Sequence, residues 1–408
     1  MEDLLEVSRR RISNTSMDFV RSINHKVQWK ARLIGVRGAR GTGKTTLLLQ
    51  HIKEAFGNEP GRVLYASLDN LWFVQNSLPG LADRFVKQGG THLFLDEIHK
   101  YPEWPRVIKN LYDDYPELSI VFTGSSLLEI LDARADLSRR AIVYTMQGLS
   151  FREYLNLSAG TAFSLFSLED ILQNHEKISA EICSTIKPFK YFETYLQTGY
   201  YPYFTEGVDL YPMRLEETVA MILEMELPLL RRVEMAYIPK LKQLLSVISE
   251  SAPFIPNISK LGERIGINRQ TLLTYIQYLA EARLTRNLYK EAQGISILQK
   301  PDKLFLENTN LMHLFKGPSW DRGNVRETFL ANQLAYEHSI VFPEAGDFLV
   351  DGKYLIEVGG KRKTRRQLKA ADAQAELTNS DSAAWVAADD IEYGYDRKIP
   401  LWLFGFLY

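Results

Sequence analysis

The chain of 408 residues has one cysteine, no long apolar run and almost no net charge. A single cysteine, Cys183, excludes an intramolecular disulfide and a cysteine-rich zinc site, and it favours a reducing compartment. No stretch of about 18 consecutive apolar residues is present, so we expect no membrane span and no membrane partner. Because the formal net charge is −1, any contact with nucleic acid must come from local basic patches.

The sequence also lacks internal repeats, low-complexity segments and an apolar stretch at its N-terminus of the kind found in signal peptides. We therefore expect a cytoplasmic protein. Its composition, 45% hydrophobic and 24% charged, is ordinary for globular proteins. Its length allows roughly two to four domains.

The most specific pattern present is a phosphate-binding loop. Residues 38–45 read Gly-Ala-Arg-Gly-Thr-Gly-Lys-Thr and match G-x-x-x-x-G-K-[ST]. In such a loop, backbone N–H groups surround a triphosphate, the lysine reaches the β and γ phosphates, and the hydroxyl holds Mg²⁺. An apolar strand (32–36) before the loop and an amphipathic helix (46–56) after it argue against a chance glycine-rich turn. The sequence therefore predicts ATP and Mg²⁺ as cofactors, with nucleotide contacts from Gly38, Ala39, Arg40, Gly41, Thr42, Gly43, Lys44, Thr45 and Thr46.

A second apolar segment, residues 91–97, ends in the carboxylate pair Asp96-Glu97. Ligands of parallel sheets bind at the carboxyl ends of the strands. We predict that Asp96 holds Mg²⁺ together with Thr45, and that Glu97 polarises the attacking water as a general base. Lys44, which reaches the phosphates, is also predicted to be catalytic. Solvated acids at a strand end are the alternative, and the loop upstream favours the functional interpretation.

Two more strands, 61–69 and 118–126, and a helix carrying Trp104 and Leu111 continue an alternation of strands and helices. This alternation predicts an α/β fold with a parallel sheet covered on both faces. Ser125, at the end of the later strand with Ser126, either senses the γ-phosphate or forms a plain turn. Arg140 either supplies positive charge to the transition state, in cis or to a neighbouring subunit, or belongs to a solvated basic pair with Arg139.

These motifs together resemble those of a known family. They are the loop, Phe-Leu-Asp-Glu-Ile-His-Lys (94–100) with Trp104, Phe-Thr-Gly-Ser-Ser (122–126), Arg140, and Leu-Ser-Phe-Arg-Glu-Tyr (149–154). They are similar to those of prokaryotic AAA+-like ATPases that carry a C-terminal domain of uncharacterised function and are akin to archaeal ATPases of the STAND assemblage. The resemblance covers most of the chain, most strongly residues 32–155, and implies an ATPase core over 1–150 and a helical lid over 151–238. The family usually has a Gly-Arg pair where this chain has Arg139-Arg140.

Residues 239–318 carry a helix-turn-helix pattern followed by a strand at 284–289. We expect Ser259 to cap the second helix and Asn268 to cap the third, which predicts a winged helix. Arg269 and Gln270 open the third helix and are of types that contact double-stranded DNA. Residues 259–290 hold six basic and two acidic residues, a net charge of +4 that favours a polyanion. A rigid spacer or a protein contact is the alternative.

The last segment, 319–408, has the pattern of a nuclease-like α/β domain. Glu327 lies on an expected helix, and the Asp351-Gly352 pair predicts a hairpin between strands 347–350 and 354–358. Asp347 and Glu357 are placed like the acids of a PD-(D/E)xK restriction-nuclease core, in which the acids hold Mg²⁺ and a lysine activates water. The expected lysine position holds Gly359, and Lys361 lies four residues after Glu357.

The nuclease-like pattern leaves three interpretations open: an active nuclease with a migrated lysine, a binding module with remnants of a metal site, or solvated strand acids. The run 361–369 contains six basic residues and no acid, among them Arg362, Lys363, Arg365 and Arg366. This run either grips a phosphate backbone or is a solvated loop.

These features together predict a Mg²⁺-dependent ATPase whose nucleotide state controls a winged helix and a nuclease-like domain. The expected partners are ATP and ADP, double-stranded DNA, and a protein partner or a second copy of the chain. An ATP-gated DNA nuclease and a non-hydrolysing nucleotide-binding scaffold are the alternatives.

Overall fold

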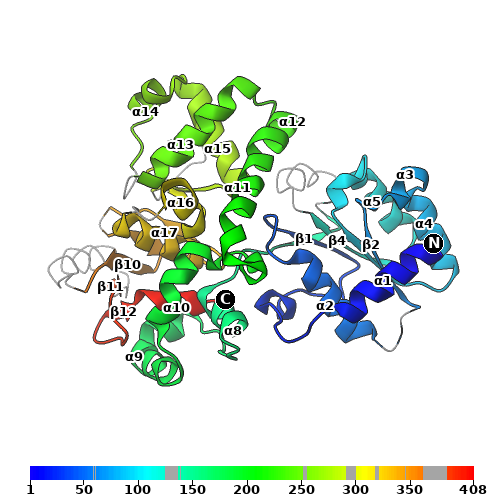
Figure 1. Cartoon of the computed structure of the whole chain (residues 1–408), viewed down its shortest axis with the longest axis horizontal. Coiled ribbons are helices and arrows are strands. Elements are labelled where there is room, and N and C mark those ends of the chain that lie inside the picture. Colours follow the sequence, from blue (N-terminus) through cyan, green and yellow to red (C-terminus); the bar gives the residue numbers. More distant parts are fainter. Residues whose placement is uncertain are drawn as a thin grey trace. The chain divides into compact units, whose positions relative to one another are not determined.

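The computed structural model describes residues 1–408 except 58, 60, 125–136, 138, 251–254, 291–299, 318–320, 345 and 362–383. The chain divides into two compact units, Met1–Gly148 and Leu149–Tyr408 (Figure 1). The further boundaries expected near residues 238 and 318 stay predictions. In the part of the chain that the structure describes, no helix is both long and apolar enough to cross a membrane.

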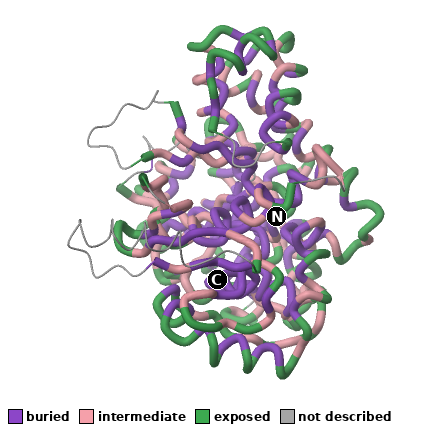
Figure 2. The backbone as a smooth tube through the Cα atoms, turned by 90° about the vertical axis from the view of Figure 1, so that its left-hand side faces the viewer, coloured by how far each residue is buried: buried purple, intermediate pink, exposed green. Residues whose placement is uncertain are grey.

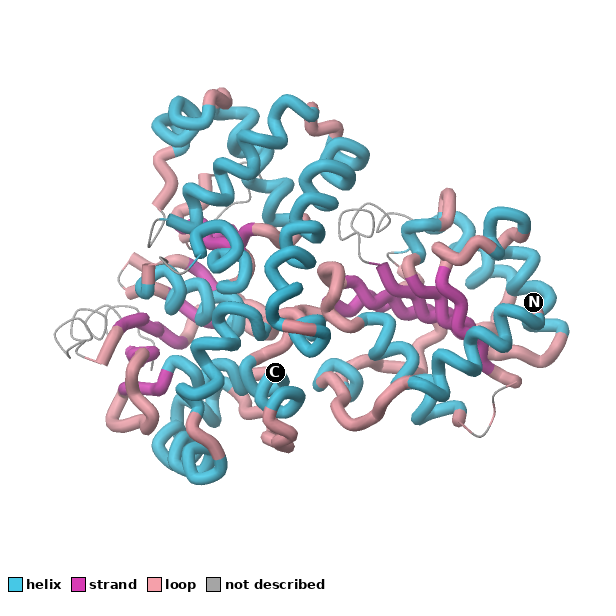
Figure 3. Tube along the Cα trace, in the orientation of Figure 1, coloured by secondary structure: helices cyan, strands magenta, loops and turns pink. Residues whose placement is uncertain are grey.

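The first unit is built on a five-stranded sheet in the order β2-β3-β4-β1-β5, with every neighbouring pair parallel. Figure 3 shows these strands side by side. Their bounds are β1 Leu33–Arg37, β2 Val63–Ser67, β3 His92–Asp96, β4 Ser119–Gly124 and β5 Ile142–Thr145. The predicted α/β fold with a parallel sheet is thus confirmed, and β5 is a strand that the sequence analysis did not predict. Because all strands run in one direction, the phosphate loop after β1, Asp96 of β3 and the end of β4 share one edge of the sheet.

Helices cover both faces of this sheet and build two apolar cores. Helix α2 (Lys44–Phe56) packs on one face, against Ile34, Val36 and Phe94. Helices α4 (Leu78–Lys87) and α5 (Trp104–Asp114) pack on the other face. Helix α1 (Glu2–Asn14) contributes Leu4 to the second core and Ile12 to the first, so it passes along the edge strand β2. The remaining elements are the short helix α3 (Trp72–Gln75) and the 3₁₀ turns η1 (Ser22–His25) and η2 (Ile98–Lys100).

The second unit is mainly helical. Its helices are α8 Phe151–Ser158, α9 Leu168–Thr185, α10 Pro188–Thr194, α11 Tyr211–Met221, α12 Leu227–Arg231, α13 Ile238–Glu250, α14 Ile258–Ile265, α15 Arg269–Glu281, α16 Thr309–Lys316 and α17 Arg322–Leu334. Two π-helical turns, η3 (Tyr195–Gly199) and η6 (Ile222–Glu226), continue α10 and α11. Short 3₁₀ helices are η4 Pro202–Glu206, η5 Val208–Leu210, η7 Met235–Tyr237 and η9 Leu401–Phe406.

A mixed sheet and a separate hairpin complete the second unit. The sheet has the order β12-β11-β10-β9-β8, antiparallel from β8 to β10 and parallel from β10 to β12. Its strands are β8 Ile340–Val341, β9 Phe348–Val350, β10 Tyr354–Gly359, β11 Ala384–Ala388 and β12 Lys398–Pro400. The predicted hairpin between β9 and β10 is confirmed, and both Asp351 (φ 52°) and Gly352 (φ 65°) adopt the positive φ that such turns require. The separate hairpin joins β6 (Thr285–Leu288) to β7 (Lys303–Leu306).

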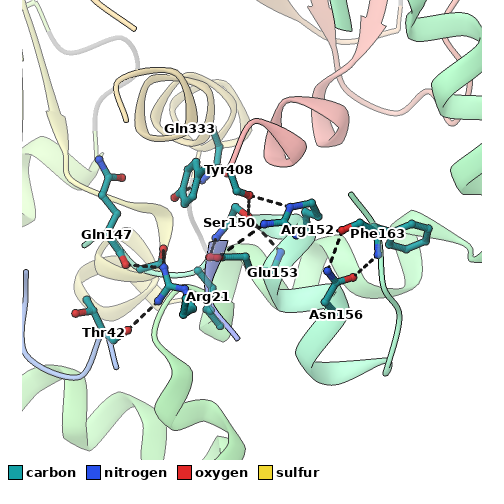
Figure 4. Close-up of polar contacts among 12 residues, drawn as sticks. Arg21, Thr42, Gln147, Ser150, Arg152, Glu153, Asn156, Phe163, Gln333 and Tyr408 are labelled. Carbon is teal, nitrogen blue, oxygen red and sulfur yellow. Dashed lines mark hydrogen bonds and ion pairs between the residues drawn. The ribbon is translucent and has the colours of Figure 1, made fainter. Parts of the chain in front are cut away.

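Aromatic rings form the centre of the second unit. The centroid of the Phe151 ring lies 5.0 Å from that of Phe192 and 5.4 Å from that of Tyr195. The ring centroids of Phe192 and Phe329 are also 5.0 Å apart. The chain then ends in a buried segment, coloured purple at the C label of Figure 2. Tyr408 is fixed to the start of α8, because its backbone oxygen accepts hydrogen bonds from the Ser150 hydroxyl and, at 3.1 Å, from Arg152 Nε. These contacts appear in Figure 4.

The three helices expected for a helix-turn-helix are present as α13, α14 and α15, and the two-stranded β6–β7 hairpin follows them. The expectation for Ser259 is wrong. Helix α14 begins at Ile258, so Asn257 takes the cap position and its side chain accepts from the Lys260 amide at 3.1 Å. The cap by Asn268 is confirmed, since its side chain accepts from the Thr271 amide at 2.9 Å.

Candidate nucleotide-binding site

The phosphate loop connects β1 to α2 and is held in a conformation that glycine permits. Gly41 has φ 81° and Gly43 has φ 95°, values that other residues rarely adopt. A Cβ atom at Gly38 would collide with the Met146 carbonyl oxygen, so only glycine fits where the loop leaves the strand. Gly43 provides no side-chain cap to α2, and the first backbone N–H groups of the helix have no intrahelical acceptor. Such a helix start suits an anion.

Lys44 lies inside the loop. Its side chain is buried, and its ammonium donates hydrogen bonds to the carbonyl oxygens of Gly38 and Ala39, each at 2.9 Å. A buried positive charge within a turn of backbone amides attracts a polyphosphate. The loop residues Gly38 to Thr45 are thus arranged as the sequence motif requires, with Arg40 exposed on the loop and Thr46 in the first turn of α2.

Asp96 connects the two predicted motifs, the phosphate loop and the acidic end of β3. Its carboxylate accepts from the Thr45 hydroxyl at 2.7 Å and from the Tyr65 hydroxyl at 2.8 Å through Oδ2. Its Oδ1 accepts from the Thr123 hydroxyl and from the Glu97 amide at 3.2 Å. An oxygen-only set built from Thr45 and Asp96 fits the ligand preference of Mg²⁺. The sequence analysis did not single out Tyr65 or Thr123.

Glu97 follows Asp96 in a left-handed conformation, with φ 52°. A non-glycine residue in this region costs roughly 1–3 kcal/mol, and such residues concentrate at functional sites. The Glu97 carboxylate lies 3.3 Å from His99 Nε2. Burial, with Lys100 and Lys44 nearby, lowers the pKa of His99 to about 4, so the ring is neutral at pH 7 and only its Nε2–H tautomer can donate to Glu97. His99 is a third residue that the sequence analysis did not single out.

A hydrogen-bond chain continues from Asp96 to helix α1. The Tyr65 hydroxyl, which donates to Asp96, accepts from an Arg11 guanidinium nitrogen at 3.0 Å. Burial, together with the charge of Asp96, raises the pKa of Tyr65 well above its usual value, so the hydroxyl stays a donor. The Ser8 hydroxyl also accepts from the Tyr65 amide at 3.1 Å. Both Arg11 and Ser8 belong to α1, so this helix fixes the tyrosine that orients the carboxylate.

The substitution Tyr65→Phe tests the role of this series of hydrogen bonds. The substitution keeps the ring and removes one donor to Asp96, and loss of such an outer partner typically weakens metal affinity roughly 10- to 100-fold. We expect the Mg²⁺ concentration for half-maximal binding of a fluorescent ATP analogue to rise by that factor. The matched control is Tyr112→Phe, which removes the hydroxyl of a partly buried tyrosine on α5. This variant should leave the Mg²⁺ titration unchanged. An unaltered Mg²⁺ titration for Tyr65→Phe would remove Tyr65 from the account.

Arg21 joins the loop to the end of the first unit (Figure 4). Its buried guanidinium donates to the Thr42 carbonyl oxygen at 2.8 Å and to the carbonyl oxygens of Gln147 at 2.8 Å and Gly148 at 2.9 Å. No motif identifies this arginine in the sequence, because its partners are backbone oxygens that lie 21, 126 and 127 residues further along the chain.

Two other predicted site residues, Arg140 and Ser125, are not among the contacts of the phosphate loop and Asp96 described above. Arg140 donates from Nε and from a terminal nitrogen to both carboxylate oxygens of Asp113 on α5, at 2.9 and 3.0 Å, so its charge is paired in this structure. Ser125 lies outside the described residues.

The four residues of the predicted C-terminal site, Glu327, Asp347, Glu357 and Lys361, lie in the part of the second unit that the structure describes. Glu327 and Asp347 share the ammonium of Lys303, at 2.9 and 3.2 Å, a lysine that the sequence analysis did not single out. Lys361 is exposed, and its carbonyl oxygen accepts from Lys398 Nζ at 3.2 Å. The residues Arg362, Lys363, Arg365 and Arg366 lie outside the described residues.

Two segments of the chain match known protein-family models. Residues 30–155 match the family model described as an AAA domain, and residues 189–320 match a domain of unknown function (DUF8612). The chain is 28% identical over 380 residues to the uncharacterized protein MJ1637 of Methanocaldococcus jannaschii, covering 84% of this chain and 79% of that protein.

Three solved structures are distant matches. The Walker-type ATPase paby2304 of Pyrococcus abyssi has 13% identity and a TM-score of 0.40, covering 77% of this chain and 97% of that one. The Aeropyrum pernix ORC1 protein in complex with DNA has 14% identity and a TM-score of 0.29, covering 77% and 92%. AMPPCP-bound DnaA from Aquifex aeolicus has 14% identity and a TM-score of 0.28, covering 68% and 88%. Residues 30–155 are thus similar to an AAA domain, and the phosphate loop and the acidic strand that they contain are joined by the hydrogen bond between Thr45 and Asp96.

Proposed function

We propose that this chain is a Mg²⁺-dependent ATPase that acts as a molecular switch for its second unit. The observation that carries the proposal is the Asp96 carboxylate, which is bonded to Thr45 of the phosphate loop and is followed directly by Glu97. These residues bring a metal-holding pair and a base to one edge of the sheet.

Each residue has a distinct task in this proposal. Lys44 and the backbone amides of the loop bind the phosphates, and Thr45 with Asp96 holds the metal. When bound, Mg²⁺ neutralises the charge of the phosphate oxygens. The Glu97 carboxylate lies 3.3 Å from Nε2 of neutral His99, a contact that would orient the carboxylate for polarising water.

Arg21 supports the proposed switching. Because its guanidinium bonds both to Thr42 in the loop and to Gln147 and Gly148, a shift of the loop would move the residues at which the first unit ends. The next residue, Leu149, donates from its amide to the Tyr200 carbonyl oxygen at 2.6 Å, and Ser150 caps α8. A displacement of Gly148 would therefore be passed directly to Leu149 and the start of α8, which are fixed by these hydrogen bonds.

Nucleic acid is the output that we favour. Arg269 and Gln270 are exposed in the first turn of α15, as a winged-helix interface with DNA would require. Part of the positive charge of residues 259–290 is neutralised within the protein, because Arg283 and Arg286 form ion pairs with Glu307 at 3.4 and 2.6 Å. Phosphate contacts would therefore depend on Arg269 and Lys260 more than on the net charge of the segment.

The ATPase rate with and without double-stranded DNA tests this output. We expect DNA to raise the rate, the effect to fall steeply with added salt, and Arg269→Ala to weaken it more than Arg106→Ala, an exposed arginine of the first unit. If the rate were measurable but indifferent to DNA at low salt, the DNA output would fail and the ATPase would stand.

A further inference from the structure

The acidic site of the second unit contains a buried lysine. Lys303 on β7 is 2% exposed. Its ammonium lies 2.9 Å from Glu327 Oε2 on α17 and 3.2 Å from Asp347 Oδ1, which precedes β9. The three charged groups come from segments that are far apart in the sequence, so the fold has assembled them.

Aromatic rings complete the surroundings of the ammonium. Lys303 Nζ lies 4.8 Å from the centroid of the Phe342 ring and 5.7 Å from that of Phe348. Ring faces attract cations within about 6 Å. An isolated buried ammonium is costly, and the cost is offset only when carboxylates and further contacts surround it. Here two carboxylates and two rings do so.

The Asp347 carboxylate is itself held by the sheet. Asp347 accepts from Lys303 through Oδ1 and from the Val358 amide of β10, at 2.8 Å, through Oδ2. Glu357, adjacent to Val358, is buried at 8% exposure. Among the described residues, no group of three or more His, Cys, Asp or Glu side chains is arranged to hold a metal ion.

We propose that Lys303 is the resident cation of this site. Its ammonium takes the place that a metal-dependent nuclease gives to a divalent ion, and it fastens the β6–β7 hairpin to α17 and to the mixed sheet. The hairpin therefore moves together with the C-terminal sheet, and the domain works without a metal, as a binding module. This inference does not depend on ATP hydrolysis.

The first test is thermal unfolding of the full chain with Lys303→Met. The variant removes the cation that lies against the buried Glu327 carboxylate and the partly buried Asp347 carboxylate, so we expect its Tm to fall by roughly 6 to 20 °C. Lys361→Met removes the exposed lysine at the end of β10 and should leave the Tm within about 2 °C. Adding Glu327→Gln and Asp347→Asn to Lys303→Met should recover at least half of the loss, because neutral amides need no cation. If this triple variant were no more stable than Lys303→Met, packing rather than charge would explain the lysine.

The second test follows metal binding and DNA cleavage instead of stability. Asp96→Asn removes the predicted nucleotide-linked metal ligand, and Mn²⁺ binding to this full-length variant is then followed by electron paramagnetic resonance. We expect no saturable Mn²⁺ binding that depends on Asp347, and no Mg²⁺-dependent cleavage of DNA by the wild-type chain. Mn²⁺ binding abolished by Asp347→Ala, or DNA cleavage abolished by Lys303→Met, would overturn the proposal and make Lys303 a nuclease residue.

Discussion

Glu97→Gln is expected to lower the steady-state rate of ATP hydrolysis by roughly 10²- to 10⁴-fold, the usual contribution of a general base. Glutamine keeps the size of the side chain and its contact with His99 but loses the negative charge that polarises water. Because Glu97 is not among the groups that hold the phosphates, the affinity for ATP should stay within a factor of about three. Phosphate release and binding of a fluorescent ATP analogue measure the two quantities separately.

The control for this experiment is Glu117→Gln, which changes an exposed glutamate in the turn before β4. It should leave both the rate and the affinity unchanged. A rate for Glu97→Gln equal to that of the wild type would mean that Glu97 is not the base. A parallel loss of ATP binding would mean that the residue supports the site structurally.

Lys44→Met is expected to lose binding and turnover together. Its ammonium is held inside the loop by the carbonyl oxygens of Gly38 and Ala39, whereas Arg40 of the same loop is exposed. A hydrogen bond to a charged group contributes about 1.5–3 kcal/mol, so we expect the Kd for ATP to rise roughly 10- to 100-fold. Hydrolysis should fall further, because the same charge stabilises the transition state.

Lys30→Met serves as the control for Lys44→Met, because Lys30 is an exposed lysine of the same unit. Isothermal titration with ATP and Mg²⁺ gives both affinities. An unchanged Kd for Lys44→Met would show that the loop binds nucleotide through its backbone alone.

The motifs of the first unit could be predicted from the sequence because their partners are local or strictly spaced. The loop, its helix and the acidic strand are contiguous segments, and parallel strands necessarily bring Thr45 and Asp96 to one edge. Tyr65 and Arg11 could not be predicted in the same way. Tyr65 reads as an ordinary residue of a buried strand, and only the passage of α1 along β2 brings Arg11 to its hydroxyl.

The second unit shows the same limit more clearly. The Asp351-Gly352 turn and the cap by Asn268 depend on neighbouring residues and were predicted. Ser259 was misplaced by two residues because Asn257 and Ser259 are both good caps, and sequence alone does not fix the helix start. Lys303 was missed because its carboxylate partners lie 24 and 44 residues further along the chain.

Hydrogen exchange in two nucleotide states tests the switch most directly. Glu97→Gln with ATP and Mg²⁺ holds the state before hydrolysis, and the wild-type chain with ADP represents the state after it. We predict different exchange at residues 146–158, which include the Arg21 partners Gln147 and Gly148, and at the start of α15, with both differences reduced in Arg21→Gln. Differences confined to the phosphate loop and its neighbours within residues 1–145 would contradict the account, since the nucleotide would then control nothing beyond its own site.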